Sequence, residues 1–261
     1  MLLRCLPWIL GALLVTPLQA QEKERPDQRP EIETMLEALA KKVSKSNRED
    51  PLEKQAVKLV RSLGDQWRPS GDKDRAAIVR GLDRVFLSRR RADKEGVRQT
   101  PIYREAAKAL GKTADKGAVK LDRWIGHPKH KRDIDLQREL ILALGRTKAD
   151  RGLKTLQGLL KEDTPKIISA AATALANFAG KDQKVRKRLF ENLLKAIESA
   201  RANARSNNST AEAIWGALSG PAQNTMRRLS GANQNGTAAW RHWWNKNKRK
   251  NWDERTGDEE L

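Results

Sequence analysis

The sequence has few of the side chains on which most active sites depend. Its 261 residues include one cysteine, three histidines and one tyrosine. The cysteine, Cys5, precedes the main part of the first apolar run, so the rest of the chain carries no thiol. Disulfide bonds, a thiolate nucleophile and cysteine-ligated zinc are therefore excluded from that part. Its fold must be stabilised by burial alone.

Familiar catalytic motifs are also missing. The sequence has no glycine-rich phosphate loop, no His-Glu-x-x-His and no Ser-His-Asp spacing. His127 and His130 have the spacing of metal ligands, but their neighbours are cationic and His242 is the only other histidine, which argues against a metal site. We therefore predict a protein that is not an enzyme, with no cofactor, no metal and no small-molecule substrate.

The first twenty residues are typical of an export signal. An arginine precedes a short apolar run over residues 6–15, and Ala20 suits the position before a peptidase cut. The run is shorter than the roughly 20 residues that span a bilayer core, and an uncleaved anchor is the alternative. We predict a signal peptide over residues 1–20, a flexible lead-in over residues 21–30, and a periplasmic or secreted location.

From residue 31 onward, apolar residues recur at the three-to-four spacing of amphipathic helices. No stretch alternates with the period of two that a half-buried strand shows. We therefore predict an all-α domain over residues 31–232, followed by a Trp-rich basic cap and tail over residues 233–261.

Proline and glycine indicate where the helices begin and end. Proline is favoured at the first helical position after a capping residue. Four prolines fit this rule: Pro51, Pro101, Pro165 and Pro221. Asp50 and Glu53 form a capping-box-like pair. Glycine adopts the left-handed conformation cheaply. Helices are accordingly predicted to stop at Gly64, Gly111, Gly145 and Gly180.

An internal repeat is the most specific pattern. Residues 104–113 align without a gap with residues 138–147, and both contain the motif Ala-Leu-Gly. A looser third copy has Ala-Leu-Ala at residues 174–176, so the alanines that open the motif lie 34 and 31 residues apart. Such periods are typical of helix–turn–helix units that bury one face against the next unit. The repeat predicts one continuous seam, filled by Leu110, Leu144 and Leu175.

Residues 138–180 resemble HEAT repeats of the phycobilisome-lyase-like subgroup. The resemblance is carried by the Ala-Leu-Gly motif at residues 143–145, Asp150, the leucine-rich second helix over residues 153–160, Asp163 and residues 171–175. It implies an α-solenoid of roughly four to five helix pairs that makes protein–protein contacts, and it implies no lyase activity. Ile168 stands where the family usually has an arginine, so a regular Asp–Arg ladder is not expected.

Four tryptophans crowd the C-terminal segment, which resembles the closing segment of HEAT-repeat proteins exported by planctomycete-type bacteria. Trp240, Trp243 and Trp244 share one helix face. They are predicted to cap the last repeat, and an aromatic platform that stacks on sugars or bases is the alternative.

The net charge of +20 favours anionic partners. Basic clusters occur at residues 88–91, 127–132 and 184–188 and around the tryptophans, although each is also compatible with a solvated surface. The candidate binding residues are Arg89, Arg90, Arg91, Lys129, Lys131, Arg132, Trp240, Arg241, Trp243, Trp244, Lys246 and Lys248.

These patterns lead to a non-catalytic exported scaffold that binds an unidentified protein partner. The alternative is a module that binds a polyanion: an acidic glycan, an envelope lipid or a nucleic acid. A third hypothesis, an enzyme acting on DNA like the HEAT-like alkylation glycosylases, is disfavoured by the export signal.

Overall fold

The computed structural model describes residues 27, 29–45, 51–88, 101–205 and 208–254. These residues form α-helices and two short 3₁₀ helices without any strand, which confirms the all-α prediction. None of the described helices is long and apolar enough to cross a membrane. The elements are α1 (Pro30–Lys45), α2 (Pro51–Gln66), α3 (Asp72–Leu87), α4 (Pro101–Leu110), α5 (Ala114–Trp124), α6 (Ile134–Arg146), α7 (Arg151–Gly158), η1 (Leu159–Lys161), α8 (Pro165–Leu175), η2 (Ala176–Phe178), α9 (Gln183–Ala204), α10 (Ser209–Ser230) and α11 (Thr237–Asn247).

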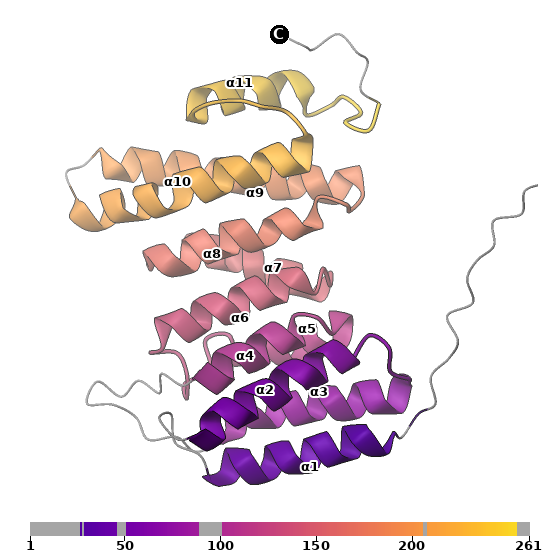
Figure 1. The fold of residues 1–261 in the computed structure, drawn as a ribbon. Coiled ribbons are helices and arrows are strands. Elements are labelled where there is room, and N and C mark those ends of the chain that lie inside the picture. Colours follow the sequence, from indigo (N-terminus) through magenta and orange to yellow (C-terminus); the bar gives the residue numbers. More distant parts are fainter. Residues whose placement is uncertain (1–26, 28, 46–50, 89–100, 206–207, 255–261) are drawn as a thin grey trace, which may run out of the picture.

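The helices follow one another from α1 at one end of the molecule to α11 at the other (Figure 1). In one series α2 packs on α4, α4 on α6, α6 on α8 and α8 on α10, while α5 contacts both α3 and α7. Buried apolar residues from Ile32 to Trp252 form one cluster. Leu110, Leu144 and Leu175 are fully buried in it, as the repeat predicts.

The repeated Ala-Leu-Gly motif is explained by close contacts between successive helices. The glycine of one helix faces an alanine of the next, with no room for a side chain between them. A Cβ added at the glycine would lie 2.9 Å from Ala109 Cβ at Gly64, 3.1 Å from Ala143 Cα at Gly111, and 2.7 Å from the Ala174 carbonyl oxygen at Gly145. The motif therefore supplies an alanine to the preceding helix, a leucine to the seam and a glycine to the following helix.

This contact corrects the role predicted for Gly64 and Gly145. Helices do stop as predicted at the other two glycines, because Gly111 directly follows α4 and Gly180 lies in the turn after η2. Gly64 and Gly145 lie inside α2 and α6, and neither they nor Gly111 and Gly180 have a left-handed φ. A glycine inside a helix costs about 1 kcal/mol relative to alanine, and close packing of the next helix offsets that cost. A left-handed glycine does end α10, where Gly231, which was not among the predicted stops, has a φ of 70°.

Three of the four predicted proline starts are confirmed, because α2, α4 and α8 begin at Pro51, Pro101 and Pro165. The fourth is wrong, since Pro221 lies inside α10. Tertiary packing outweighs the local signal there: α10 packs on α8 and α9, and both Leu218 and Ala222 beside the proline are fully buried.

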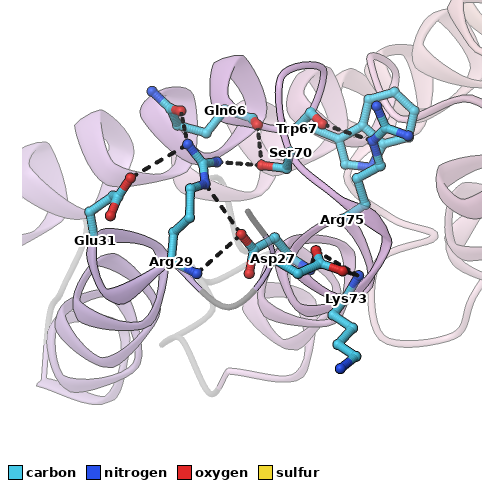
Figure 2. Close-up of polar contacts among 9 residues, drawn as sticks. Asp27, Arg29, Glu31, Gln66, Trp67, Ser70, Lys73 and Arg75 are labelled. Atoms are coloured by element: carbon cyan, nitrogen blue, oxygen red, sulfur yellow. Dashed lines mark hydrogen bonds and ion pairs between the residues drawn. The ribbon is translucent and has the colours of Figure 1, made fainter. Parts of the chain in front are cut away.

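The described chain starts with a docked segment (Figure 2). The Arg29 guanidinium donates to Asp74 Oδ2 at 3.2 Å and to the Ser70 hydroxyl at 2.5 Å. Asp27 accepts from the backbone N–H groups of Lys73 and Asp74, at 3.1 and 3.3 Å, in the first turn of α3. A carboxylate at this end of a helix satisfies orphan donors and complements the helix dipole.

Residues 21–30 are predicted to be a flexible lead-in, whereas Asp27 and Arg29 of that range contact α3. The side chains of Arg29 and Asp74 are only 9% and 5% exposed, and no local pattern around either residue indicates that the two meet. Residues 21–26 and 28, like the predicted signal peptide, lie outside the described part.

Candidate functional site

The basic loop between α5 and α6 is anchored to the end of α3. The Lys129 ammonium donates to the carbonyl oxygens of Phe86 and Ser88, each at 2.8 Å, and His130 Nε2 lies 3.0 Å from the same Phe86 oxygen. A cation at a helix C-terminus is stabilised by the helix dipole. Lys129 and His130 thus connect parts of the fold, and the described residues contain no cluster of three or more potential metal ligands.

The other residues of the predicted stripe are only partly placed. Lys131 and Arg132 are exposed on the same loop. Arg89, Arg90 and Arg91 lie outside the described residues. Whether these three join the loop in one surface therefore stays a prediction.

The C-terminal tryptophans pack around Phe190 of α9. The Phe190 ring centroid lies 5.5 Å from that of Trp240, 5.3 Å from Trp243, 5.2 Å from Trp244 and 5.6 Å from Trp252. Trp243 is half-buried and the other three are buried. Their faces are largely occupied by protein, which favours the cap over the stacking platform.

Arg241 forms an ion pair with Glu198. Its Nε donates to Oε1 at 2.7 Å and its Nη2 donates to the other carboxylate oxygen. The bond to Glu198 raises the pKa of Arg241 above its already high ordinary value. Of the predicted residues in this segment, Lys246 and Lys248 remain exposed.

Two basic stretches that are far apart in sequence meet beside the tryptophans. The Lys187 ammonium donates to the carbonyl oxygen of Lys250, 63 residues away, at 2.6 Å. Gln183 donates to Asn251 at 2.6 Å. Burial, and next the neighbouring Arg186, lower the pKa of Lys187. We call this surface the basic end; its cations are Lys184, Lys187, Arg188, Lys246, Lys248, Arg249 and Lys250.

A groove between α3 and α5 was missed by sequence reasoning. It measures about 530 Å³, and its apolar floor consists of Ala76, Val79 and Val119. Val119 is 40% exposed, which is unusual for a valine of this protein. The rim of this α3–α5 groove carries four cations: Lys73, Arg80, Lys116 and Lys120. Within the part of the chain that the structure describes, no carboxylate lines the groove. These cations come from two separate helices, so no basic run marks them in the sequence.

Two of the rim cations have partners outside the groove. Lys116 pairs with Asp72 at 3.3 Å, and Lys120 lies 3.5 Å from Asp83. No ion pair is recorded for Lys73 or Arg80 within the described part of the chain. The groove therefore offers positive charge beside exposed apolar surface.

The edge formed by α2, α4, α6 and α8 has balanced charges instead. Successive helices are linked there by Arg61–Glu105 at 3.0 Å, Lys112–Asp65 at 2.5 Å and Lys166–Asp135 at 3.0 Å. Hydrogen bonding to Glu105 raises the pKa of Arg61, and hydrogen bonding to Lys166 lowers the pKa of Asp135. Paired charges of both signs make this edge a poor binding site for an anion.

Several buried carboxylates accept hydrogen bonds that connect helices or cap their ends. Glu53 accepts from the Ile102 N–H at the start of α4 at 3.3 Å; its predicted capping partner, Asp50, lies outside the described residues. Asp83 accepts from Trp124 Nε1 at 2.8 Å, and Asp133 accepts from the Leu136 N–H at 2.9 Å. Burial raises the pKa of Asp133, and its bond to the Leu136 N–H opposes that rise. Each of these groups holds one element of the fold in place.

Comparison of the chain with protein-family models, with curated proteins and with solved structures finds no match.

Proposed function

We propose that this chain is an exported, non-catalytic HEAT-like α-solenoid that binds an acidic protein partner in the α3–α5 groove. The observation that carries the proposal is the composition of that groove. An apolar floor with an exposed valine, surrounded by four cations, has the apolar centre and polar rim of a protein interface. The absence of carboxylates from the groove's lining favours a partner that presents acidic side chains.

The solenoid part of the proposal is supported by the contacts between units. The α-helices pack on those one or two places away along the chain, and the same Gly–Ala approach recurs from α2 to α8. A repeat array also needs terminal units that cover its exposed core. The tryptophans around Phe190 at one end, and α1 with its docked Arg29 at the other, fit that requirement.

The non-catalytic and exported parts rest on the residues themselves. Buried groups that could perform acid–base chemistry, such as Asp83, Asp133 and His130, are engaged in contacts between helices. Export rests on the pattern of the first twenty residues, which is typical of a signal peptide.

A second candidate function, polyanion binding, is favoured by the basic end. Lys187 and Lys250 are brought into contact there, and each has further exposed lysines or arginines within four residues of it in the sequence. The neighbouring tryptophans are largely buried, which leaves charge without an apolar floor. Such a surface suits a sulfated or phosphorylated polymer, whose binding releases counterions.

Each function is tested with variants of its own site. With the chain lacking residues 1–20 as bait, we expect envelope extract to yield a specific protein that Val119→Gln and Lys73→Gln each fail to retain. Lys58→Gln, an exposed lysine of α2, is the matched control and should retain it. If the protein is retained equally by all variants, the groove is not the binding site.

For the second function, heparin serves as the probe. Its affinity should fall steeply with salt in a log–log plot, and Lys184→Gln combined with Arg188→Gln should lower the slope by about 1–2. The same slope in wild type and variant would contradict a role for the basic end.

A further inference from the structure

A second groove, between α1 and α3, has the chemistry of a site for a single alkyl chain with an acidic head. It measures about 730 Å³, within the roughly 300–1,000 Å³ range of small-molecule sites. Its apolar walls come from both helices. They are formed by Leu36, Leu39, Ala40 and Val43 of α1 and by Ala77, Gly81, Val85 and Leu87 of α3.

The spacing of these residues makes the groove elongated. On α3, Ala77, Gly81 and Val85 follow one another at intervals of four residues, and so lie along one face of the helix. Leu39 and Val85 are 1% exposed and form the floor, whereas Leu87 at one end is 59% exposed. Small residues line the groove on both helices: Ala40 on α1, and Ala77 and Gly81 on α3. The tip of Leu36 packs directly on Gly81, where an added Cβ would lie 2.3 Å from it.

Charge at the rim is of one sign. Arg80 and Arg84, one helical turn apart on α3, line the groove, and no carboxylate of the described residues does. A guanidinium binds a carboxylate through two parallel hydrogen bonds. Arg80 also lines the α3–α5 groove, so it stands on the ridge between the two sites, whereas Arg84 belongs to this groove alone.

We propose that the α1–α3 groove binds a free fatty-acid-like alkyl carboxylate, with the chain along the apolar walls and the carboxylate at Arg80 and Arg84. The apolar walls exclude a small polar anion as the main occupant, and the two arginines favour a negative head over a neutral one. The inference does not rest on the protein partner proposed above: the two grooves share Arg80, and the test below uses Arg84 and Ala77, which line this groove and not the α3–α5 groove.

Calorimetric titration of dodecanoate into the chain, below the concentration at which it forms micelles, tests this proposal. We expect saturable binding of one molecule. Arg84→Gln should weaken it roughly tenfold, as expected for loss of a charge-assisted hydrogen bond. Ala77→Leu, which fills the groove, should weaken it at least as much. Arg228→Gln, an exposed arginine of α10, is the matched control and should bind as the wild type does.

Two further ligands distinguish the contribution of the alkyl chain to the affinity from that of the carboxylate head. Butyrate carries the same head on a short chain, and dodecyl maltoside carries the same chain on a neutral head; both should bind at least tenfold more weakly. Vesicles containing phosphatidylglycerol should bind wild type and Ala77→Leu equally, because a bilayer is not the proposed source. Equal dodecanoate affinity in wild type, Arg84→Gln and Ala77→Leu, or no saturable binding, would overturn the proposal.

Discussion

Phe190→Ala is expected to release the C-terminal cap, at a loss of about 3–5 kcal/mol of stability at that end of the molecule. Phe190 is fully buried, and its ring contacts four tryptophans. Removing it leaves a cavity in an aromatic cluster that only one helix and a short turn cover. Hydrogen exchange of the backbone amides of α11 should accelerate on the order of a hundredfold or more, and tryptophan emission should shift to the red.

Phe190→Leu is the conservative control. It keeps most of the apolar volume, so a loss of about 1–1.5 kcal/mol is expected, with α11 still protected. The amides of α2 and α4 should exchange as in the wild type in both variants, because units of a repeat array contact mainly their neighbours. Unchanged protection of α11 in Phe190→Ala would show that the tryptophans do not depend on α9.

Arg29→Met should destabilise the opposite end by a similar amount, about 3–5 kcal/mol, because Asp74 then loses a cation inside the protein. The two side chains are 9% and 5% exposed, and Nε lies 3.2 Å from Oδ2. Methionine preserves much of the packing of the arginine stem, so the effect reports mainly on charge and hydrogen bonding. Hydrogen exchange in α1 and in the first turn of α3 measures it directly.

Glu31→Ala is the matched control for Arg29. Glu31 lies 3.5 Å from the same guanidinium, but its side chain is 59% exposed. Exposed ion pairs contribute about 0–1 kcal/mol, so this variant should behave almost as the wild type does. If Arg29→Met and Glu31→Ala had equal, small effects, the docked segment would not stabilise α3.

The predictions that succeeded rest on local patterns. The three-to-four spacing of apolar residues correctly predicts that the chain is helical, and proline after a capping residue correctly predicts where α2, α4 and α8 begin. The repeat identified Leu110, Leu144 and Leu175 as core residues before their surroundings were known. Such patterns are visible in a sequence because neighbouring residues on one helix face share one environment.

The predictions that failed depended on partners far away in the sequence. Gly145 is small because Ala174 lies against it, and nothing near Gly145 in the sequence distinguishes this role from that of a helix stop. Arg29 is held by Asp74, which lies 45 residues away in the sequence. Because that partner is so distant, the residues around Arg29 indicate only a flexible segment. The rims of both grooves contain arginines and lysines that, in sequence, look like any solvated helix face.

The stacking of successive helices depends on close contacts between a glycine of one helix and an alanine of the next. Gly64 and Ala109 are the pair on which these contacts can be tested most directly. An added Cβ at Gly64 would lie 2.9 Å from Ala109 Cβ. Gly64→Ala alone should therefore lower the free energy of unfolding by about 1–3 kcal/mol, although alanine is the better helix former.

Ala109→Gly removes the opposing methyl group, so the double variant should recover part of that loss. We predict a coupling free energy of at least about 1 kcal/mol between the two sites, measured by denaturant unfolding of the wild type, both single variants and the double variant. Effects that add to within about 0.5 kcal/mol would mean that α2 and α4 do not meet at these residues. That result would contradict the Gly–Ala stacking of successive helices that is described for the fold.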